Sequence, residues 1–170
     1  MVTPGLKATV AHLKEVSILK CFSDAELEQI LALGETKAFD PHANIVIEGE
    51  LTYGLYIMLE GLCGIYKGNR GTNDTYDVGQ LRAGGFFGEM SLIEDGSRSA
   101  TVRSLTDAQV FFVGKEQFNQ FVAQSAELKT RFLESTVKDL CGRLRELDEN
   151  YVSAQVQLWK FALKKTKEAA

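Results

Sequence analysis

The chain has 170 residues, 45% of them apolar, which is enough for one well-packed domain with an appendage but not for two large domains. Its 19 basic and 23 acidic residues leave a net charge of −4, which disfavours nucleic acid or an anionic membrane as a partner. No apolar run approaches the roughly 20 residues of a membrane helix, and the N-terminus lacks the layout of a signal peptide. We therefore expect a cytoplasmic protein.

The three cysteines, Cys21, Cys63 and Cys141, lie far apart and form no CxxC pair. This spacing suggests neither a disulfide framework nor a zinc site. We expect reduced and mostly buried thiols.

The first zone, residues 5–34, is expected to be helical because its apolar residues recur at helical spacing. The start of its second helix, in FSDAELEQILAL, has a complete signal. Ser23 can cap this helix, and Glu26 three residues later can close a capping box. Phe22 can pack onto Leu27 as a hydrophobic staple, and Gly34 can end the helix.

The second zone, residues 36–113, changes to a strand pattern. Its short runs are rich in β-branched and aromatic residues: NIVIEG, GLYIMLEG, CGIYKG, TYDVGQL, SATVRS and AQVFFVG. Turn signals such as KGNRGTND and EDGS separate them, and most of the chain's 15 glycines fall here. Many short strands with glycine punctuation predict an antiparallel β jelly-roll sandwich.

The third zone runs from Lys115 to the end and is expected to be helical again. The segment KEQFNQFVAQ places its phenylalanines on one face, and Ser125 can cap the helix that follows. Beyond it, apolar residues alternate steps of four and three: Leu133, Val137, Leu140, Leu144, Leu147, Tyr151, Ala154, Leu158 and Phe161. This heptad, with Val137 and Leu144 at a and Leu147 at d, indicates a coiled coil.

The three zones together predict an α+β, mainly β fold with short N-terminal helices, a jelly roll and a long C-terminal coiled-coil helix. The sequence predicts a division into residues 1–124 and a C-terminal helix, residues 125–170. Because the distal heptads have no further domain in this chain to pack against, we expect a homodimer through residues 133–161. The alternative is that the last turns fold back onto the sandwich of their own subunit.

The stretch from Phe86 to Val102, FFGEMSLIEDGSRSATV, is the candidate binding site. Gly88 before Glu89 suggests a short helix that starts directly after a strand and offers free backbone N–H groups to an anion. With the guanidinium of Arg98, these donors suit one phosphate, while the carboxylate of Glu89 suits a sugar hydroxyl. The alternative on spacing alone is a surface pair between arginine and glutamate.

The same stretch closely resembles the phosphate-binding cassette of cyclic-nucleotide-binding domains, the family that includes bacterial catabolite activators, protein kinase A regulatory subunits and cyclic-nucleotide-gated channels. Gly88, Glu89, Arg98 and Ala100 all fall at the family spacing. The resemblance covers roughly residues 16–145. It implies a cyclic-nucleotide ligand and no metal.

The resemblance also implies roles for individual residues. Arg98 would pair with the cyclic phosphate, and Glu89 would accept a hydrogen bond from the ribose 2′-hydroxyl. The backbone amides of Ser99 and Ala100 would complete the phosphate site, with Gly88 allowing close approach. The remaining contacts implied are Met90 and Ser91 in the short helix, and Ile65, Val78 and Gly79 beside the base.

In this family the helix after the sandwich closes over the base as a lid. An ungapped comparison with the bacterial activators places Arg143 at that lid, as a candidate for a polar or stacking contact. The alternative is that Arg143 is a solvated flank of the coiled coil. Ser99 occupies the place where cyclic-GMP-selective members often carry threonine, which favours cyclic AMP over cyclic GMP.

The bacterial activators continue into a helix-turn-helix, and we expect no such DNA-reading segment here. The chain is then either a stand-alone sensor dimer or one module of a longer protein. Catalysis of the metal-dependent cupin type is disfavoured because His12 and His42 are the only histidines. A dimerisation module with a degenerate pocket is the other alternative, although both Arg98 and Glu89 are present.

Overall fold

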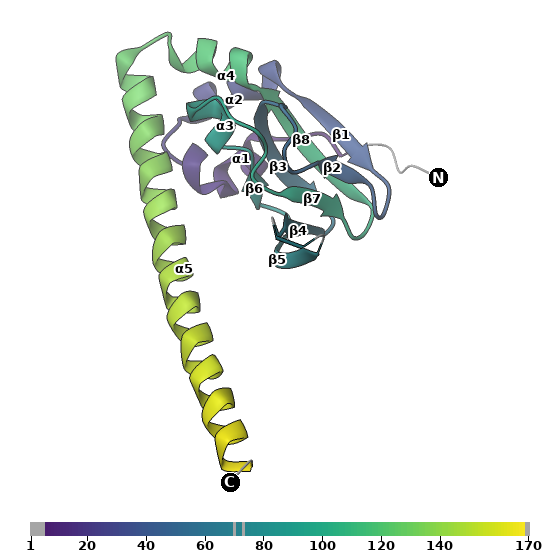
Figure 1. Ribbon diagram of the computed structural model, residues 1–170. Coiled ribbons are helices and arrows are strands. Elements are labelled where there is room, and N and C mark those ends of the chain that lie inside the picture. Colours follow the sequence, from purple (N-terminus) through teal and green to yellow (C-terminus); the bar gives the residue numbers. More distant parts are fainter. Residues whose placement is uncertain (1–5, 70, 73, 169–170) are drawn as a thin grey trace.

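The computed structural model describes residues 6–69, 71–72 and 74–168. Two four-stranded antiparallel sheets pack face to face, with strand orders β1-β8-β3-β6 and β2-β7-β4-β5 (Figure 1). Their strands are β1 Glu35–Phe39, β2 Asn44–Val46, β3 Gly54–Glu60, β4 Cys63–Gly68, β5 Thr75–Leu81, β6 Phe86–Phe87, β7 Thr101–Ser104 and β8 Ala108–Gly114. The predicted antiparallel sandwich is confirmed, and each of the six strand runs named from the sequence contains a strand.

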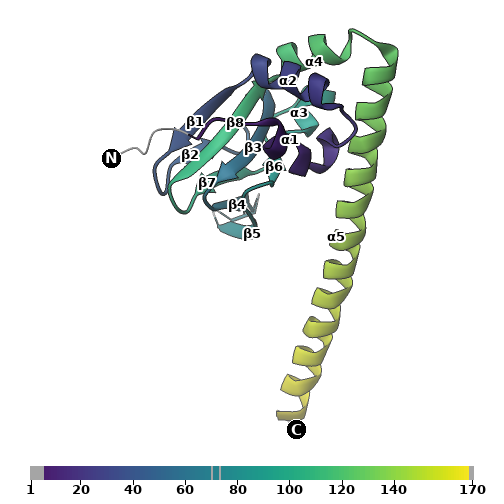
Figure 2. The same ribbon diagram turned by 180° about the vertical axis from the view of Figure 1, so that it is seen from behind.

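The central strand β3 is buried on both faces, and its alternating side chains divide the core in two. Leu55 and Ile57 join a cluster under the helices, whereas Tyr56 and Met58 join the cluster between the sheets. The helix-side cluster also contains Phe118, Phe121 and Phe132, so that it ties both helical zones to one face of the sandwich. The N-terminal helices lie between the sandwich and the start of the C-terminal helix (Figure 2).

The first helix is shorter than predicted. We expected helix from residue 5, which is outside the described residues, but α1 spans only Val10–Glu15. Thr9 is the N-cap of α1, because its hydroxyl accepts a hydrogen bond from the backbone N–H of His12. A 3₁₀ turn, η1, follows at Ser17–Leu19 and leads to α2, Asp24–Leu33.

The predicted capping box of α2 is confirmed. The Ser23 hydroxyl accepts from the backbone N–H of Glu26, and the Glu26 carboxylate accepts from the backbone N–H of Ser23 at 2.7 Å. The same carboxylate forms an ion pair of 2.6 Å with Arg131 of the C-terminal helix. Glu26 therefore joins two elements that lie more than 100 residues apart in sequence.

The hydrogen bond from Arg131 lowers the pKa of Glu26 below its ordinary value. A carboxylate whose folded pKa is depressed adds stability above its unfolded pKa of about 4.3, and loses it as the pH falls through the folded pKa. We therefore expect Glu26→Gln to lower the free energy of unfolding more at pH 7 than near pH 3, as measured by urea denaturation. Glu28→Gln, exposed on the same helix, is the control. An equal loss for Glu26→Gln at both pH values would contradict this assignment.

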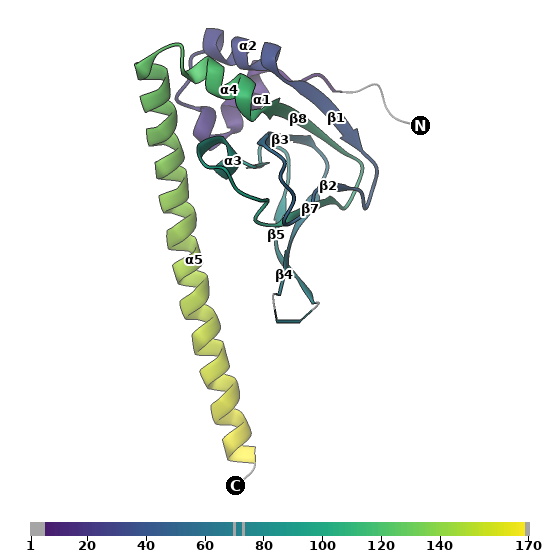
Figure 3. The same ribbon diagram turned by 45° about the horizontal axis from the view of Figure 1, so that its top comes forward.

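The third zone forms α4, Lys115–Val122, and α5, Ala126–Glu168. Phe118, Phe121 and Val122 of α4 are buried as their spacing predicts, and Ser125 caps α5 by accepting from the backbone N–H of Glu127 at 3.1 Å. The 43-residue α5 runs alongside the domain and continues past it (Figure 1, Figure 3).

The heptad side chains of α5 do not fold back onto the sandwich. Leu144, Leu147 and Leu158 are 57%, 64% and 63% exposed, respectively. This exposure excludes the fold-back alternative over the described heptads and leaves an apolar face without a covering element of the same subunit. The homodimer remains a prediction.

The cysteines occupy three different environments. Burial raises the pKa of Cys63 to about 11 and also raises the pKa of half-buried Cys21. Cys141 differs from the expectation of mostly buried thiols, because it lies exposed on α5. Over the part of the chain that the structure describes, no helix has the length and apolar character needed to cross a membrane.

Candidate functional site

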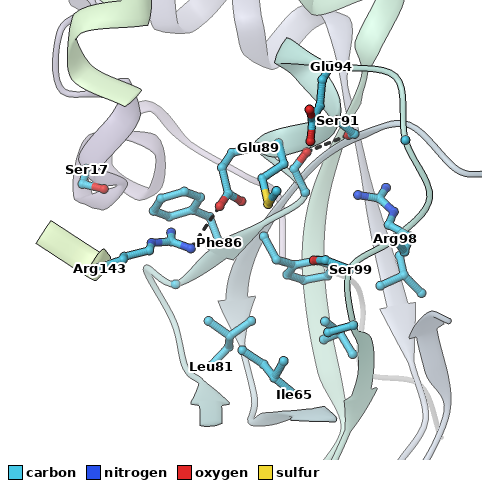
Figure 4. Close-up of a pocket in the computed structure, with 18 of the residues that line it drawn as sticks. Ser17, Ile65, Leu81, Phe86, Glu89, Ser91, Glu94, Arg98, Ser99 and Arg143 are labelled. Atoms are coloured by element: carbon cyan, nitrogen blue, oxygen red, sulfur yellow. Dashed lines mark hydrogen bonds and ion pairs between the residues drawn. The ribbon is translucent and has the colours of Figure 1, made fainter. Parts of the chain in front are cut away.

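A cavity of about 590 Å³ opens between the sandwich and α5 (Figure 4). Strands β4, β5 and β7 supply apolar walls through Ile65, Leu81 and Val102, and the chain from residue 84 to 100 supplies most of the remaining lining. Among the described residues of α5, Arg143 alone lines the cavity, which it reaches from the opposite side.

Most of the site residues predicted from the sequence line this cavity. Those that line the cavity are Ile65, Gly88, Glu89, Met90, Ser91, Arg98, Ser99, Ala100 and Arg143. Val78 and Gly79 are not among the lining residues. They lie on β5, where the side chain of Val78 is 57% exposed.

Arg98 is only 7% exposed, although it carries a charge. Its Nε donates to the hydroxyl of Thr52 at 2.9 Å, and its Nη atoms donate to the carbonyl of Gly54 at 3.3 and 3.4 Å. Its guanidinium carbon lies 5.3 Å from the centre of the Tyr56 ring. Burial lowers the pKa of Arg98 below its ordinary value, while nearby Tyr56 and the carboxylates of Glu89 and Glu50 act in the opposite direction.

Among the described residues Arg98 forms no ion pair. A buried cation with only neutral acceptors in contact is costly, because these acceptors do not compensate its lost hydration. A buried guanidinium in a cavity wall is chemically suited to pair with an anion.

The turn at Gly88 brings the short helix α3, Met90–Ile93, next to Arg98. Gly88 has a φ of +89°, and a Cβ at this position would lie 2.3 Å from the carbonyl oxygen of Gly54 and 2.6 Å from Nη1 of Arg98. Ser91 fastens the turn, since its hydroxyl donates to the Gly88 carbonyl at 2.7 Å and accepts from the Gly54 amide at 3.0 Å. Ser91 therefore has a structural role in addition to its place in the wall.

Glu89 is the N-cap residue of α3 and is almost completely buried, with 5% of its surface exposed. Its Oε1 lies 3.0 Å from Nη1 of Arg143, which is the one ion pair between α5 and the cassette among the described residues (Figure 4). Arg143 also lies over the ring of Phe86, 4.7 Å from its centre, and its Nε is 2.8 Å from Asp139. Arg143 is thus part of the site and not merely a solvated flank of the helix.

The comparisons with known proteins agree with this geometry. A family model described as cyclic nucleotide-binding domain matches residues 36–125, which is more than half of the chain. The chain belongs to the cyclic nucleotide-binding domain family. The match begins in β1 and ends directly before α5, so it contains the sandwich, apart from Glu35, and α4.

Relatives of this cyclic nucleotide-binding domain include regulatory proteins and kinases. The chain is 31% identical to a cAMP-dependent protein kinase regulatory subunit of Candida albicans over 116 residues, 68% of the chain and 24% of that protein. It is 28% identical to the human cGMP-dependent protein kinase 2 over 151 residues, 88% of the chain and 19% of that protein. The chain thus spans a quarter or less of these two relatives.

Two solved structures have the same fold. The Thermus thermophilus catabolite activator protein superposes with a TM-score of 0.68 at 22% identity, covering 78% of this chain and 60% of that one. The regulatory domain of Toxoplasma gondii PKA, crystallised with cAMP, superposes with a TM-score of 0.65 at 25% identity, covering 76% and 48%.

Several residues that shape the site of this cyclic nucleotide-binding domain were not found from the sequence. Thr52, Gly54 and Tyr56 hold Arg98 from β3 and the loop before it, more than 40 residues upstream. Phe86 belongs to the motif, but the motif does not predict that its ring lies under Arg143. Gly54 carried a detectable signal, a glycine at the start of an apolar strand, whereas the others had none.

The positive φ at Gly88 makes a specific prediction for this domain. Gly88→Ala should lower the free energy of unfolding by about 1–3 kcal/mol, because the new methyl group meets backbone and guanidinium atoms that cannot both move away. It should also displace Arg98 and weaken ligand binding. Gly96→Ala is the matched control, since a Cβ there has no neighbour within 4 Å. Chemical denaturation of both variants checks the difference, and equal stabilities would contradict the assigned strain.

Proposed function

We propose that this chain is a cyclic-nucleotide sensor domain that prefers cyclic AMP to cyclic GMP and signals through its C-terminal helix. The observation that carries the proposal is the buried Arg98, which faces the cavity and forms no ion pair among the described residues. A cyclic phosphate would supply the missing negative charge. Membership of the cyclic nucleotide-binding domain family supports the same ligand class.

The proposed binding mode assigns the phosphate to the Arg98 end of the cavity and the base to the apolar wall, with the sugar between them. Arg98 binds the cyclic phosphate together with the backbone amides of Ser99 and Ala100, and Gly88 permits close approach. Glu89 accepts from the ribose 2′-hydroxyl. The base then lies along the apolar wall, on the side from which Arg143 reaches the cavity; the remaining contacts proposed are Met90, Ser91 and Ile65, whereas Val78 and Gly79, which do not line the cavity, are not proposed.

Discrimination between the two bases is proposed to depend on Ser99. The relatives include both cAMP-dependent and cGMP-dependent proteins, so membership of the family does not decide the base. Serine and threonine both carry a hydroxyl, but the methyl group of threonine restricts its rotamers and would hold the hydroxyl toward a guanine amino group. We expect Ser99→Thr to shift the ratio of affinities toward cyclic GMP by about tenfold, as one additional hydrogen bond would. Calorimetric titration with both nucleotides measures this ratio, and an unchanged ratio would remove Ser99 from the selectivity assignment.

Titration of the wild-type chain with cyclic AMP and cyclic GMP tests the main proposal. Saturable binding of cyclic AMP, weaker for cyclic GMP, is the expected result. Absence of heat with either nucleotide at millimolar concentration, in a folded protein, would overturn the sensor function. A dimer that persists without any nucleotide binding would instead favour a purely structural dimerisation module.

The proposed signalling route uses the division between residues 1–124, which bind the nucleotide, and residues 125–170, which form the lid and dimerisation helix. A ligand can move this helix only if it binds the two helix positions with different affinity. Arg143 supplies the contact through which α5 can sense the ligand. The proposal assigns no catalytic step to the chain and places it in the cytoplasm as a homodimer.

A further inference from the structure

The C-terminal helix α5 presents two different faces beside the cavity. Leu128, Phe132 and Thr136 are buried against the domain. The heptad residues, among them Leu140 and Leu144, are 40% and 57% exposed on another face. Arg143 lies between these faces, because it precedes the a-position Leu144 and therefore occupies position g.

Heptad positions determine what Arg143 meets in a pair of such helices. In a parallel, in-register pair, each g residue faces the e residue five positions later on the partner helix. For Arg143 that residue is Asp148 of a second copy, an opposite charge, and for Asn150 it is Gln155, a second polar side chain. In an antiparallel pair g faces g, so Arg143 cannot meet Asp148. The pair of opposite charges therefore favours the parallel arrangement.

Within its own chain Arg143 has two anionic partners, Asp139 of the same helix and Glu89, and the proposed ligand needs the second of them. Its guanidinium neutralises Glu89, whose side chain is only 7% exposed. A buried carboxylate is costly without a hydrogen-bond donor, so Arg143 cannot leave unless another donor replaces it. The ribose hydroxyl in the proposed binding mode is such a donor. Arg143 itself is 45% exposed, which allows its long side chain to turn toward the heptad face.

We propose that Arg143 exchanges partners: it pairs with Glu89 of its own chain in the nucleotide-free protein and with Asp148 of a second copy when a nucleotide occupies Glu89. The exchange rests on the proposed nucleotide binding and homodimer, and it specifies how the two are linked. Nucleotide binding separates the guanidinium of Arg143 from Glu89 at the edge of the coiled-coil interface. The second copy then supplies the carboxylate of Asp148 as its new partner. Because coupling between two binding equilibria is reciprocal, dimerisation should also tighten nucleotide binding.

Asp148→Asn tests the exchange without touching the cavity, since Asp148 is exposed and does not line it. In the wild type, saturating cyclic AMP should lower the dissociation constant of the dimer about five- to tenfold at low salt, the effect of two partly exposed ion pairs. Asp148→Asn should lose this change, whereas the neighbouring Glu149→Gln, at the outward f position, should retain it. Sedimentation equilibrium with and without cyclic AMP measures all three proteins.

The outcomes separate this inference from the proposed function. If the wild type binds no nucleotide or remains monomeric in both conditions, the proposed function fails first and the exchange with it. If the wild type binds and dimerises but Asp148→Asn responds to cyclic AMP as the wild type does, the exchange alone is overturned.

Cysteine cross-linking tests the parallel register independently. In a Cys141→Ser background, Tyr151→Cys places two thiols at facing a positions of a parallel pair, where a disulfide should form readily under mild oxidation. Val152→Cys, one residue further at position b, is the matched control and should not cross-link. Absence of cross-linking by Tyr151→Cys in a protein that sediments as a dimer would overturn the parallel arrangement.

Discussion

Replacement of Arg98 by alanine should abolish measurable cyclic-nucleotide binding, with a loss of affinity of at least about 100-fold. Charged hydrogen bonds contribute about 1.5–3 kcal/mol each, and a bidentate contact between guanidinium and phosphate contains two of them. Arg98 is also buried, so that water does not replace the lost contacts. Isothermal titration calorimetry with cyclic AMP measures the loss.

Two further variants and a stability measurement show whether Arg98 acts on the ligand or on the fold. Arg98→Lys keeps the charge but loses the planar pair of donors, and should recover only part of the affinity. Arg103→Ala, which removes an arginine that bonds to Asn44 outside the cavity, should bind as the wild type does. Wild-type affinity in Arg98→Ala would refute the phosphate assignment.

The nucleotide-free Arg98→Ala protein should be as stable as the wild type to within about 1 kcal/mol, because removing a desolvated cation offsets the loss of its hydrogen bonds. Cyclic AMP at 100 times its dissociation constant should stabilise the wild type by about 2.7 kcal/mol and leave Arg98→Ala unchanged. Urea denaturation with and without nucleotide gives both quantities. A large loss of stability without ligand would show instead that Arg98 is mainly a structural residue.

The double substitution Leu144→Asp with Leu147→Asp should convert the proposed homodimer into a monomer. These positions are 57% and 64% exposed in the isolated subunit, so aspartate there should not harm the fold. In a coiled coil the same positions face the partner helix, so each aspartate would bury an unpaired charge. We expect the dimer dissociation constant to rise by more than about 1,000-fold, since each buried charge costs several kcal/mol.

The control for the coiled-coil interface also replaces two apolar residues of α5 by aspartate. Val152→Asp with Val156→Asp alters residues that are 60% and 46% exposed but occupy positions b and f. This variant should remain dimeric in sedimentation velocity runs. A dimer that survives the leucine substitutions, or a wild type that is monomeric with and without nucleotide, would contradict the heptad assignment.

Local patterns in the sequence were sufficient for most of the fold. The strand runs, the capping box of Ser23 and Glu26, the buried face of α4 and the heptads of α5 all depend on side chains within a few residues of one another. The start of α1 was predicted too early. It depends on a capping box between Thr9 and His12, which the spacing of apolar residues does not reveal. Strand β1, Glu35–Phe39, was missed because it is a largely polar edge strand whose order comes from pairing with β8.

For the site, the sequence alone determined the chemical groups: an arginine, a glutamate and a glycine turn at a spacing typical of the cyclic nucleotide-binding domain family. Only the tertiary structure decided that Arg98 is buried without an ion pair among the described residues, that Gly54 and Thr52 hold it, and that Arg143 closes onto Glu89. These contacts join segments 44 to 54 residues apart, and they form only when the sheets and α5 have packed. Spacing within one segment can predict which groups a site contains, but charge compensation depends on which distant segments meet.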